Sequence, residues 1–263
     1  LGHLWYRGTL FVDARGQTLT ELDPYGNALT IDLRRRFDLI YGLAAWVATN
    51  DYSIANLSVN FESFARRLSE GVVGVRNLSV APAGVTRLVY PRNGNVAILG
   101  RDFSTDPRAE VREDMARLQQ ARKIVISGPY EMAVGGFGAV ARLALYRGEN
   151  FWGIVNVALD LPPILEEAGI AKQRGLQLAL RDARQRLFFG APAVFSSDPV
   201  IHRVDLPDGY WELAAIPALG WQGVVQRDLS IFDAVSLTVG LLLSTIAYLL
   251  AFRDARLAQR VAE

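Results

Sequence analysis

The chain contains no cysteine and only two histidines, and these shortages exclude several kinds of chemistry. A chain without cysteine can form neither a disulfide framework nor a thiolate nucleophile. His3 and His202 lie far apart, and the sequence has no HExxH pair of the kind that holds zinc in peptidases. We therefore expect no metal site and no cofactor.

The chain also lacks an excess of one charge. Its formal net charge is +1 at pH 7, and no basic stretch is interleaved with aromatic residues, as would be expected of a nucleic-acid-binding protein. Glu166 and Glu167 are adjacent and would point apart on a helix, so they cannot form a paired acid and base. No nucleophile elbow is present. We expect no nucleic-acid partner and no enzyme activity, and a membrane-anchored hydrolase is the least favoured alternative.

Long hydrophobic runs are absent from most of the chain, including residues 1–22, but one lies near the C-terminus. Residues 234–252 form a run of nineteen residues without a charge. As a helix this run would span about 28 Å, close to the thickness of the hydrocarbon core of a bilayer. A buried core helix is the weaker alternative, because the flanking charges are asymmetric: Asp228 and Asp233 precede the run, and Arg253, Arg256 and Arg260 follow it.

The position of these arginines predicts the orientation of the span. Cations collect on the cytoplasmic side of membrane helices, so the C-terminus is expected in the cytoplasm and the preceding residues outside it. Because the first residue is not methionine, we expect the chain to be a fragment that lacks an upstream anchor. The sequence ends eleven residues after the apolar run, so we also expect a downstream output domain to be missing from it. Within the run, small residues recur every four positions and predict a face on which two such helices pair: Ser236, Gly240 and Ser244.

The stretch from residue 86 to 146 predicts a small α+β module. Asp106 and Pro107 are typical of a helix start, because Asp106 can cap the helix and the missing N–H of Pro107 costs nothing there. Val111, Met115 and Leu118 then give that helix one buried stripe. Short apolar runs predict strands of a mostly antiparallel sheet at residues 86–90, 96–99, 124–126, 139–146 and 152–159.

A second sheet is expected after residue 168. Its strands are predicted at residues 177–181, 186–189, 200–206 and 210–216, with a hairpin turn at residues 207–209. Trp211 and Trp221 are expected to anchor its core. We expect an α+β fold: a long N-terminal stalk helix, two stacked antiparallel sheets and one C-terminal transmembrane helix.

The N-terminal part carries a helical pattern interrupted by a turn signal. Residues 23–27 read Asp-Pro-Tyr-Gly-Asn and predict a break. From Asp32 onward one face of a long helix is apolar, with Arg34, Arg35 and Arg36 mostly opposite it: Leu33, Phe37, Ile40, Tyr41, Ala44 and Val47. This helix either packs on its own domain or pairs with a second copy as a dimer stalk.

Motifs in the central stretch resemble the CHASE domain. They are residues 85–91, 93–95, 100–103, Ser127-Gly128-Pro129, Gly135-Gly136-Phe137-Gly138 and Arg142. Similar sequence continues on both sides, so that the resemblance runs from about Leu33 to Trp221. CHASE domains are extracellular or periplasmic sensors of histidine kinases and cyclic-di-GMP enzymes, and they include the plant cytokinin receptors. The resemblance implies two PAS-like units, of which the distal one binds ligand.

From these patterns we predict the periplasmic small-molecule sensor of a receptor in the bacterial inner membrane. The output domain would be a diguanylate cyclase, a phosphodiesterase or a histidine kinase, and the receptor would be a homodimer. A periplasmic module that docks another protein is the alternative. The predicted divisions are an N-terminal segment with the stalk (residues 1–59), a distal ligand-sensing module (60–168), a membrane-proximal module (169–230), the span (231–253) and the start of a cytoplasmic linker (254–263).

The candidate ligand site centres on Arg142, which lies in an apolar strand where an unpaired guanidinium is costly. A bidentate carboxylate or another planar acceptor would satisfy it, so the ligand is expected to carry a carboxylate. The CHASE resemblance implies a cytokinin-like ligand as the other possibility. An internal salt bridge from Arg142 to Asp102 or Glu131 is the alternative. For Ser127 the alternative is a turn cap, and for the aromatic residues it is a core position. The other candidate ligand-binding residues are Ser127, Tyr90, Tyr130, Phe137, Gly136 and Asp102.

Overall fold

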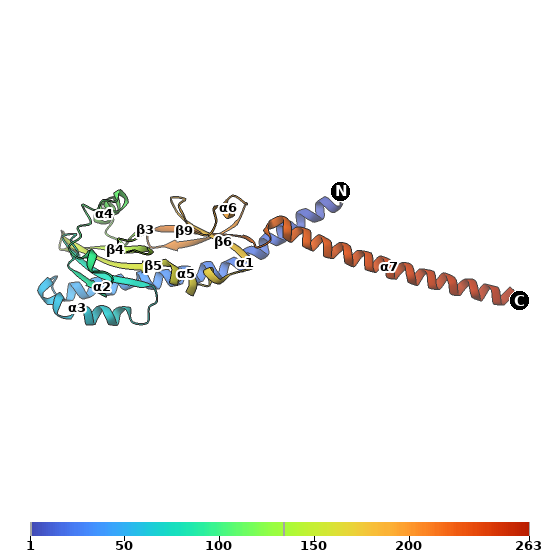
Figure 1. Ribbon diagram of the computed structural model, residues 1–263, viewed down its shortest axis with the longest axis horizontal. Coiled ribbons are helices and arrows are strands. Elements are labelled where there is room, and N and C mark those ends of the chain that lie inside the picture. The colour runs from blue at the N-terminus through green and yellow to red at the C-terminus, as the bar shows by residue number, and fades with distance from the viewer. Residues whose placement is uncertain (1, 134, 263) are drawn as a thin grey trace.

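A long N-terminal helix runs beneath two antiparallel sheets that follow one another along it (Figure 1). The computed structural model describes residues 2–133 and 135–262. Helix α1 (Gly2–Phe37) is followed by α2 (Leu39–Thr49) and α3 (Ile54–Ser69) beneath the sheet that lies farther from the C-terminal helix. We call this sheet the distal sheet and the other the proximal sheet. The expected fold class, α+β with a long helix and two antiparallel sheets, is confirmed.

The predicted break at residues 23–27 is wrong, because α1 continues through Pro24. Leu22 and Leu29, on either side of this proline, are fully buried in the main core, which also contains residues of the proximal sheet. Asp23 adds a contact to that sheet, since its carboxylate lies 2.9 Å from Nδ1 of His202. Burial of the apolar stripe therefore outweighs the hydrogen bond that Pro24 cannot make.

The predicted helix from Asp32 onward is instead divided at Asp38, between α1 and α2. Leu33, Phe37, Ile40 and Val47 are fully buried as expected, but Tyr41 is exposed. Arg36 also departs from the expected polar face. Its side chain is fully buried, forms an ion pair with Glu167 and donates to the carbonyl of Val73 (2.7 Å). The long aliphatic stem and several donors of arginine allow such a position.

The distal sheet has five antiparallel strands in the order β2-β1-β5-β4-β3. Its long strands β4 and β5 form a hairpin at the centre, and β1 pairs with the other edge of β5. The segment between β2 and β3 contains the short helix η1 (Val96–Ile98) and helix α4 (Ala109–Ala121). The strands are β1 (Val75–Pro82), β2 (Leu88–Tyr90), β3 (Val125–Glu131), β4 (Phe137–Arg147) and β5 (Asn150–Asp160).

Three features of this module differ from the sequence predictions. Residues 96–98 form a 3-10 turn rather than part of a strand. Strand β1 was not predicted, because Asn77 and Ser79 interrupt its apolar pattern. Asp106 does not cap α4, whose first residue is Ala109; the carboxylate of Asp106 is buried and engaged by arginines instead.

Side chains alternate between two faces of the distal sheet, each with its own core. On β5, Val155 and Val157 face the main core beneath the sheet, whereas Ile154 and Ala158 belong to a second core under α4. Val111, Met115 and Leu118 of α4 complete this second core, as their spacing predicted. Figure 1 shows α4 on one side of the sheet and α2 and α3 on the other.

The proximal sheet has four antiparallel strands in the order β7-β6-β9-β8 and follows the short helices α5 (Leu161–Glu167) and η2 (Ile170–Lys172). Helix α6 (Pro192–Phe195) lies between β7 and β8. Trp211 and Trp221 are both buried, which confirms them as core anchors. The strands are β6 (Leu176–Asp182), β7 (Leu187–Phe189), β8 (Val200–Leu206) and β9 (Gly209–Pro217).

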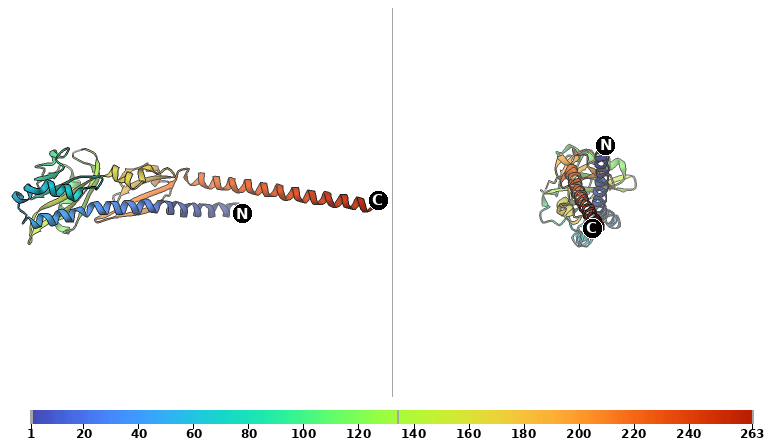
Figure 2. Two further views of the ribbon diagram at one scale, coloured as in Figure 1. Left: turned by 90° about the horizontal axis from the view of Figure 1, so that it is seen from below. Right: turned by 90° about the vertical axis from the view of Figure 1, so that its right-hand side faces the viewer.

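Helix α7 (Gly220–Ala262) begins three residues after β9 and projects away from both sheets (Figures 1 and 2). The part from Gly220 to Leu250 is long and apolar enough to cross a membrane. The side chains of residues 230–250 are all exposed, so this part is not the buried core helix that the sequence left as an alternative. An apolar helix surface of this size with no protein against it matches the needs of a lipid-facing span.

Candidate ligand-binding cavity

A row of polar side chains crosses the face of the distal sheet that lies under α4. Arg142 of β4 pairs with Asn156 of β5, and Asn156 pairs with Ser79 of β1. Because side chains alternate along a strand, these three point to the same face. Asn77 and Ser127 share this face, because Asn77 lies two residues from Ser79, and Ser127 lies two residues from Val125, the partner of Arg142 in β3. All five are at least 96% buried, in a sheet whose neighbouring positions are apolar.

Arg142 is held by neutral partners. Its Nε donates to Ser127 Oγ (3.0 Å), Nη1 donates to Asn156 Oδ1 (2.8 Å) and Nη2 donates to Tyr130 Oη (3.4 Å). The guanidinium carbon lies 4.4 Å from the centre of the Phe103 ring, a cation–π contact. The alternative salt bridge to Asp102 or Glu131 is not formed, and no ion pair of Arg142 occurs within the described ranges.

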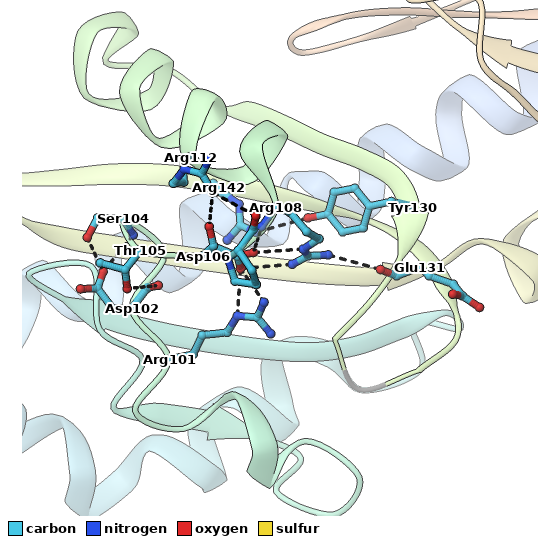
Figure 3. Close-up of polar contacts among 11 residues, drawn as sticks. Arg101, Asp102, Ser104, Thr105, Asp106, Arg108, Arg112, Tyr130, Glu131 and Arg142 are labelled. Carbon is cyan, nitrogen blue, oxygen red and sulfur yellow. Dashed lines mark hydrogen bonds and ion pairs between the residues drawn. The ribbon is translucent and has the colours of Figure 1, made fainter.

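A buried carboxylate lies beside this row. Asp106 is 1% exposed, and its Oδ2 lies 2.6 Å from Nη2 of Arg101 while its Oδ1 lies 3.1 Å from Nε of Arg108 (Figure 3). Burial alone would raise the pKa of Asp106, but hydrogen bonds from the side chain and backbone of Arg108 and from Arg101 outweigh it, so the pKa falls below its ordinary value of 3.8. Asp106 is therefore ionised at neutral pH.

Arg108 shows the reciprocal effect. Burial alone would lower its pKa, but the hydrogen bond to Asp106 and the neighbouring Tyr130 raise it. The guanidinium carbon of Arg108 lies 4.6 Å from the centre of the Tyr130 ring. Arg142 contacts the same side chain by donating a hydrogen bond to its hydroxyl. Tyr130 therefore lies between two arginines.

Together these groups surround a cavity between the distal sheet and the segment that leads into α4. The cavity encloses about 440 Å³ of space between atoms, its open mouth included. Its wall combines apolar side chains with convergent polar groups, the usual composition of a small-molecule site. The lining residues are Asn77, Ser79, Ile98, Arg101, Phe103, Arg108, Tyr130, Met132, Ala133, Val140, Arg142, Asn156 and Ala158.

The structure places only some of the sequence-predicted residues at the cavity. Arg142 and Tyr130 line the cavity, and Ser127 lies behind Arg142 as its hydrogen-bond partner. Asp102 is outside the lining, where its Oδ1 accepts from the backbone N–H and the hydroxyl of Ser104 (2.8 and 2.6 Å; Figure 3). Tyr90 packs against the main core on the other face of the sheet.

Phe137 and Gly136 also lie outside the lining, in and beside the turn between β3 and β4. The ring of Phe137 stacks on Phe188 of the proximal sheet, with ring centres 6.4 Å apart. Gly136 has a φ of +79°, and a Cβ there would come within 2.3 Å of Arg76 Nη2. The backbone conformation therefore favours glycine here, and a larger residue would also displace the end of the Arg76 side chain. The cavity rim is formed by the neighbouring Met132 and Ala133.

Several lining residues are not among those predicted from the sequence, although for some of them the sequence contains a signal. Asn77 and Ser79 in β1, and Asn156 in β5, occupy alternate positions in otherwise apolar strands. Polar residues at such positions share a buried face and require partners there. Arg101 and Arg108 offered no comparable signal, because they lie in irregular chain on either side of Asp106 and only the folded loop brings them together.

Known proteins share the architecture of this chain without close sequence similarity. No protein-family model matches the chain, and no curated protein matches it. The solved structures of similar fold include an extracellular ligand-binding receptor from Desulfohalobium retbaense, with a TM-score of 0.61 and 15% identity over 76% of this chain. The chain spans 40% of that receptor's length.

Two further structures match almost end to end. One is the ligand-binding domain of the amino acid chemoreceptor PctC of Pseudomonas aeruginosa in complex with GABA, with a TM-score of 0.55, 16% identity, and coverage of 77% of this chain and 98% of that domain. The other is the sensor domain of the V. cholerae histidine kinase DctB, with a TM-score of 0.55, 11% identity and coverage of 81% and 98%. The chain therefore has the fold of extracellular ligand-binding sensor domains.

Proposed function

We propose that this chain is the extracytoplasmic sensor of a membrane receptor and that it binds a small molecule in the cavity between the distal sheet and the segment that leads into α4. The proposal rests mainly on the environment of Arg142. This residue is 98% buried at the wall of a cavity, and its hydrogen-bond partners in the described structure are all neutral. A buried guanidinium without a carboxylate is costly unless a ligand completes its pairing. The fold shared with sensor domains, one of them in complex with GABA, supports the same conclusion.

The proposed receptor is of the CHASE type, with residues 60–168 as the ligand-sensing module and residues 169–230 as the membrane-proximal one. The motif resemblance supports this assignment, and so does the cavity in the distal module. Helix α7 would anchor the chain in the inner membrane, with Arg253, Arg256 and Arg260 on the cytoplasmic side and a cyclic-di-GMP enzyme or histidine kinase beyond them. Pairing of two spans through Ser236, Gly240 and Ser244 remains a prediction from the sequence.

Contacts between the modules offer a route from the cavity to the span. Helix α4 follows directly on Asp106 and Arg108, and its outer face carries Arg117, whose Nη1 lies 2.8 Å from Asp208 Oδ2 in the β8–β9 turn. Strand β9 then leads into α7 within three residues. A ligand that moves the loop around Asp106 would shift α4 against this turn, and so bias the dimer between two arrangements.

Thermal unfolding in the presence of a library of small metabolites tests the proposal. At least one compound should raise the Tm of the wild-type chain in detergent, and Arg142→Ala should abolish that rise without changing the circular dichroism spectrum. Arg142→Lys, which keeps the charge but loses the planar fork, should retain only part of it. Arg181→Ala in the proximal sheet is the control and should respond like the wild type.

If both Arg142 variants bind every compound as the wild type does, the cavity is not the sensor site. If no compound shifts the Tm but a periplasmic protein binds a surface of the chain, the docking module that the sequence left as an alternative is correct.

A further inference from the structure

The charges around the cavity do not balance. Three guanidinium groups, those of Arg101, Arg108 and Arg142, form part of its wall, and no aspartate or glutamate is among the lining residues in the described structure. The carboxylate of Asp106 lies directly behind two of the arginines. Among these four groups, one carboxylate against three guanidiniums leaves an excess of two positive charges, with Arg142 buried and the side chains of Arg101 and Arg108 23% and 28% exposed.

Asp106 has no lone pair to offer a ligand. Its Oδ1 accepts from the backbone N–H of Arg108 (3.0 Å) and from Arg108 Nε (3.1 Å). Its Oδ2 accepts from Arg101 Nε (2.9 Å) and from Arg108 Nη2 (3.3 Å) and also lies 2.6 Å from Arg101 Nη2. A carboxylate has about four acceptor positions, so both oxygens are saturated. An ammonium group in the ligand would find no free carboxylate among the lining residues and would face two uncompensated positive charges.

Arg142, in contrast, has donors to spare. A guanidinium carries five N–H donors, and three of those of Arg142 reach Ser127, Asn156 and Tyr130. One hydrogen therefore remains on each terminal nitrogen, and both are available to the oxygens of a carboxylate. Phe103 covers one face of the guanidinium, so that an acceptor must approach its edge.

The other two arginines of the cavity wall come from the loop rather than from the sheet. Arg142 of β4 meets the hydroxyl end of Tyr130, and Arg108 stacks on its ring. Figure 3 shows Arg101 and Arg108 both directed at Asp106. A ligand that contacts Arg142 and this pair therefore bridges two separate segments of the chain.

We propose that the ligand is a small dianion with an acid group at each end, a short dicarboxylate, and that zwitterionic amino acids are excluded. One carboxylate pairs with the edge of Arg142, and the other pairs with Arg101 and Arg108. The apolar wall formed by Ile98, Val140 and Ala158 contacts the carbon chain between them. This inference rests on the proposed function, since it names the ligand class of the same cavity.

Calorimetry with three four-carbon probes tests the proposal on the full chain in detergent. Succinate carries two carboxylates, butyrate carries one, and 4-aminobutyrate replaces one carboxylate by an ammonium group. Succinate, or its three-, five- or six-carbon homologue, should bind at least tenfold more tightly than butyrate, and 4-aminobutyrate should bind more weakly than butyrate. Inorganic phosphate, which concentrates its charge at one point, should bind more weakly than the best dicarboxylate.

Two variants assign the ends of the ligand. Arg142→Ala should weaken binding of succinate and of butyrate at least tenfold. Arg101→Gln should weaken the binding of succinate at least fivefold but leave the binding of butyrate unchanged. Arg108 still pairs with Asp106 in this variant, so only the contact of the second carboxylate with Arg101 is lost. Arg181→Ala should change neither, and circular dichroism should show all three variants folded.

The possible failures are distinguishable. If 4-aminobutyrate, a neutral purine or phosphate binds more tightly than every dicarboxylate and its binding requires Arg142, the dicarboxylate assignment is wrong but the sensor function stands. If dicarboxylates bind equally well to Arg142→Ala, the site lies elsewhere. If neither these probes nor the metabolite library bind, both proposals fail.

Discussion

Two arginines, one in each sheet, are held in similar ways but differ in one partner. Arg142 in the distal sheet stacks on Phe103, and Arg181 in the proximal sheet stacks on Phe195, with the guanidinium carbon 4.4 and 4.0 Å from the ring centres. Arg181 also forms a salt bridge with Glu212 on the neighbouring strand (2.5 Å). At the neighbouring strand position, Arg142 has the neutral Asn156. The proximal sheet neutralises its own cation, whereas Arg142 in the distal sheet has no carboxylate partner in the described structure, and we propose that a ligand supplies one.

The helices that cover the two sheets also differ, in length and in what lies beneath them. Helix α4 over the distal sheet has thirteen residues, and α6 beside the proximal sheet has four. In the proximal module aromatic rings fill the space, with Phe188 and Trp211 in edge contact at 4.9 Å. In the distal module polar side chains and a cavity occupy the space under the covering segment. Similar antiparallel sheets therefore carry a packed aromatic cluster in one case and a polar cavity in the other.

Of the variants that test this comparison, the one that removes the buried carboxylate of the distal module should lower stability most. Asp106→Asn leaves Arg101 and Arg108 without a negative partner, which we expect to lower the free energy of unfolding by about 3 kcal/mol, at the low end for a broken buried pair because both arginines remain partly exposed. Urea unfolding followed by circular dichroism measures this. A loss below about 1 kcal/mol would show that solvent stabilises these arginines as well as Asp106 does.

The pH dependence of stability provides a second readout of the same variant. The folded-state pKa of Asp106 lies below its ordinary value of 3.8, so its charged form stabilises the fold above about pH 4. That contribution is lost as the pH falls through the folded-state pKa. The wild-type chain should therefore lose more stability than Asp106→Asn between pH 5 and the acid limit, and parallel curves would contradict the assignment.

A carboxylate partner for Arg142, like the one that Arg181 has, should have the next largest effect, this time on ligand affinity. Asn156→Asp places a carboxylate where Asn156 Oδ1 already accepts from Arg142, 2.8 Å away. The variant should fold and should bind the ligand about tenfold or more weakly, since a charge-assisted hydrogen bond of about 1.5–3 kcal/mol now forms within the protein. Calorimetry with the best ligand measures this, and undiminished affinity would show that Arg142 is not the ligand's partner.

The reverse change in the proximal sheet should have the smallest effect. Glu212→Gln removes the charge opposite Arg181 but keeps an acceptor, and both side chains of the pair are partly exposed. We expect a loss of at most about 1 kcal/mol in the free energy of unfolding and no change in ligand affinity. Chemical denaturation and calorimetry check the two parts. A large loss of affinity would show that the proximal sheet takes part in binding.

Local pattern was sufficient for much of the architecture. The long uncharged run predicted the apolar part of α7, and the alternating runs predicted most strands of both sheets, because helix and strand periodicities are properties of neighbouring residues. Arg142 could be selected for the same reason, since a cation within an apolar strand requires a partner wherever that strand lies. The identity of the partner could not be deduced in this way.

Tertiary structure alone decided the remaining features, because each depends on residues that are distant in sequence. Pro24 lies within a helix because Leu22 and Leu29 on either side of it are buried in a core shared with a sheet about 150 residues later in the chain. Phe137 faces the proximal sheet rather than the cavity because Phe188 lies against it. Asp106 is a buried ion-pair partner instead of a helix cap because the loop folds Arg101 and Arg108 onto it. Sequence spacing determines which face of an element a residue occupies, but the charge and shape of a cavity are set by which faces meet.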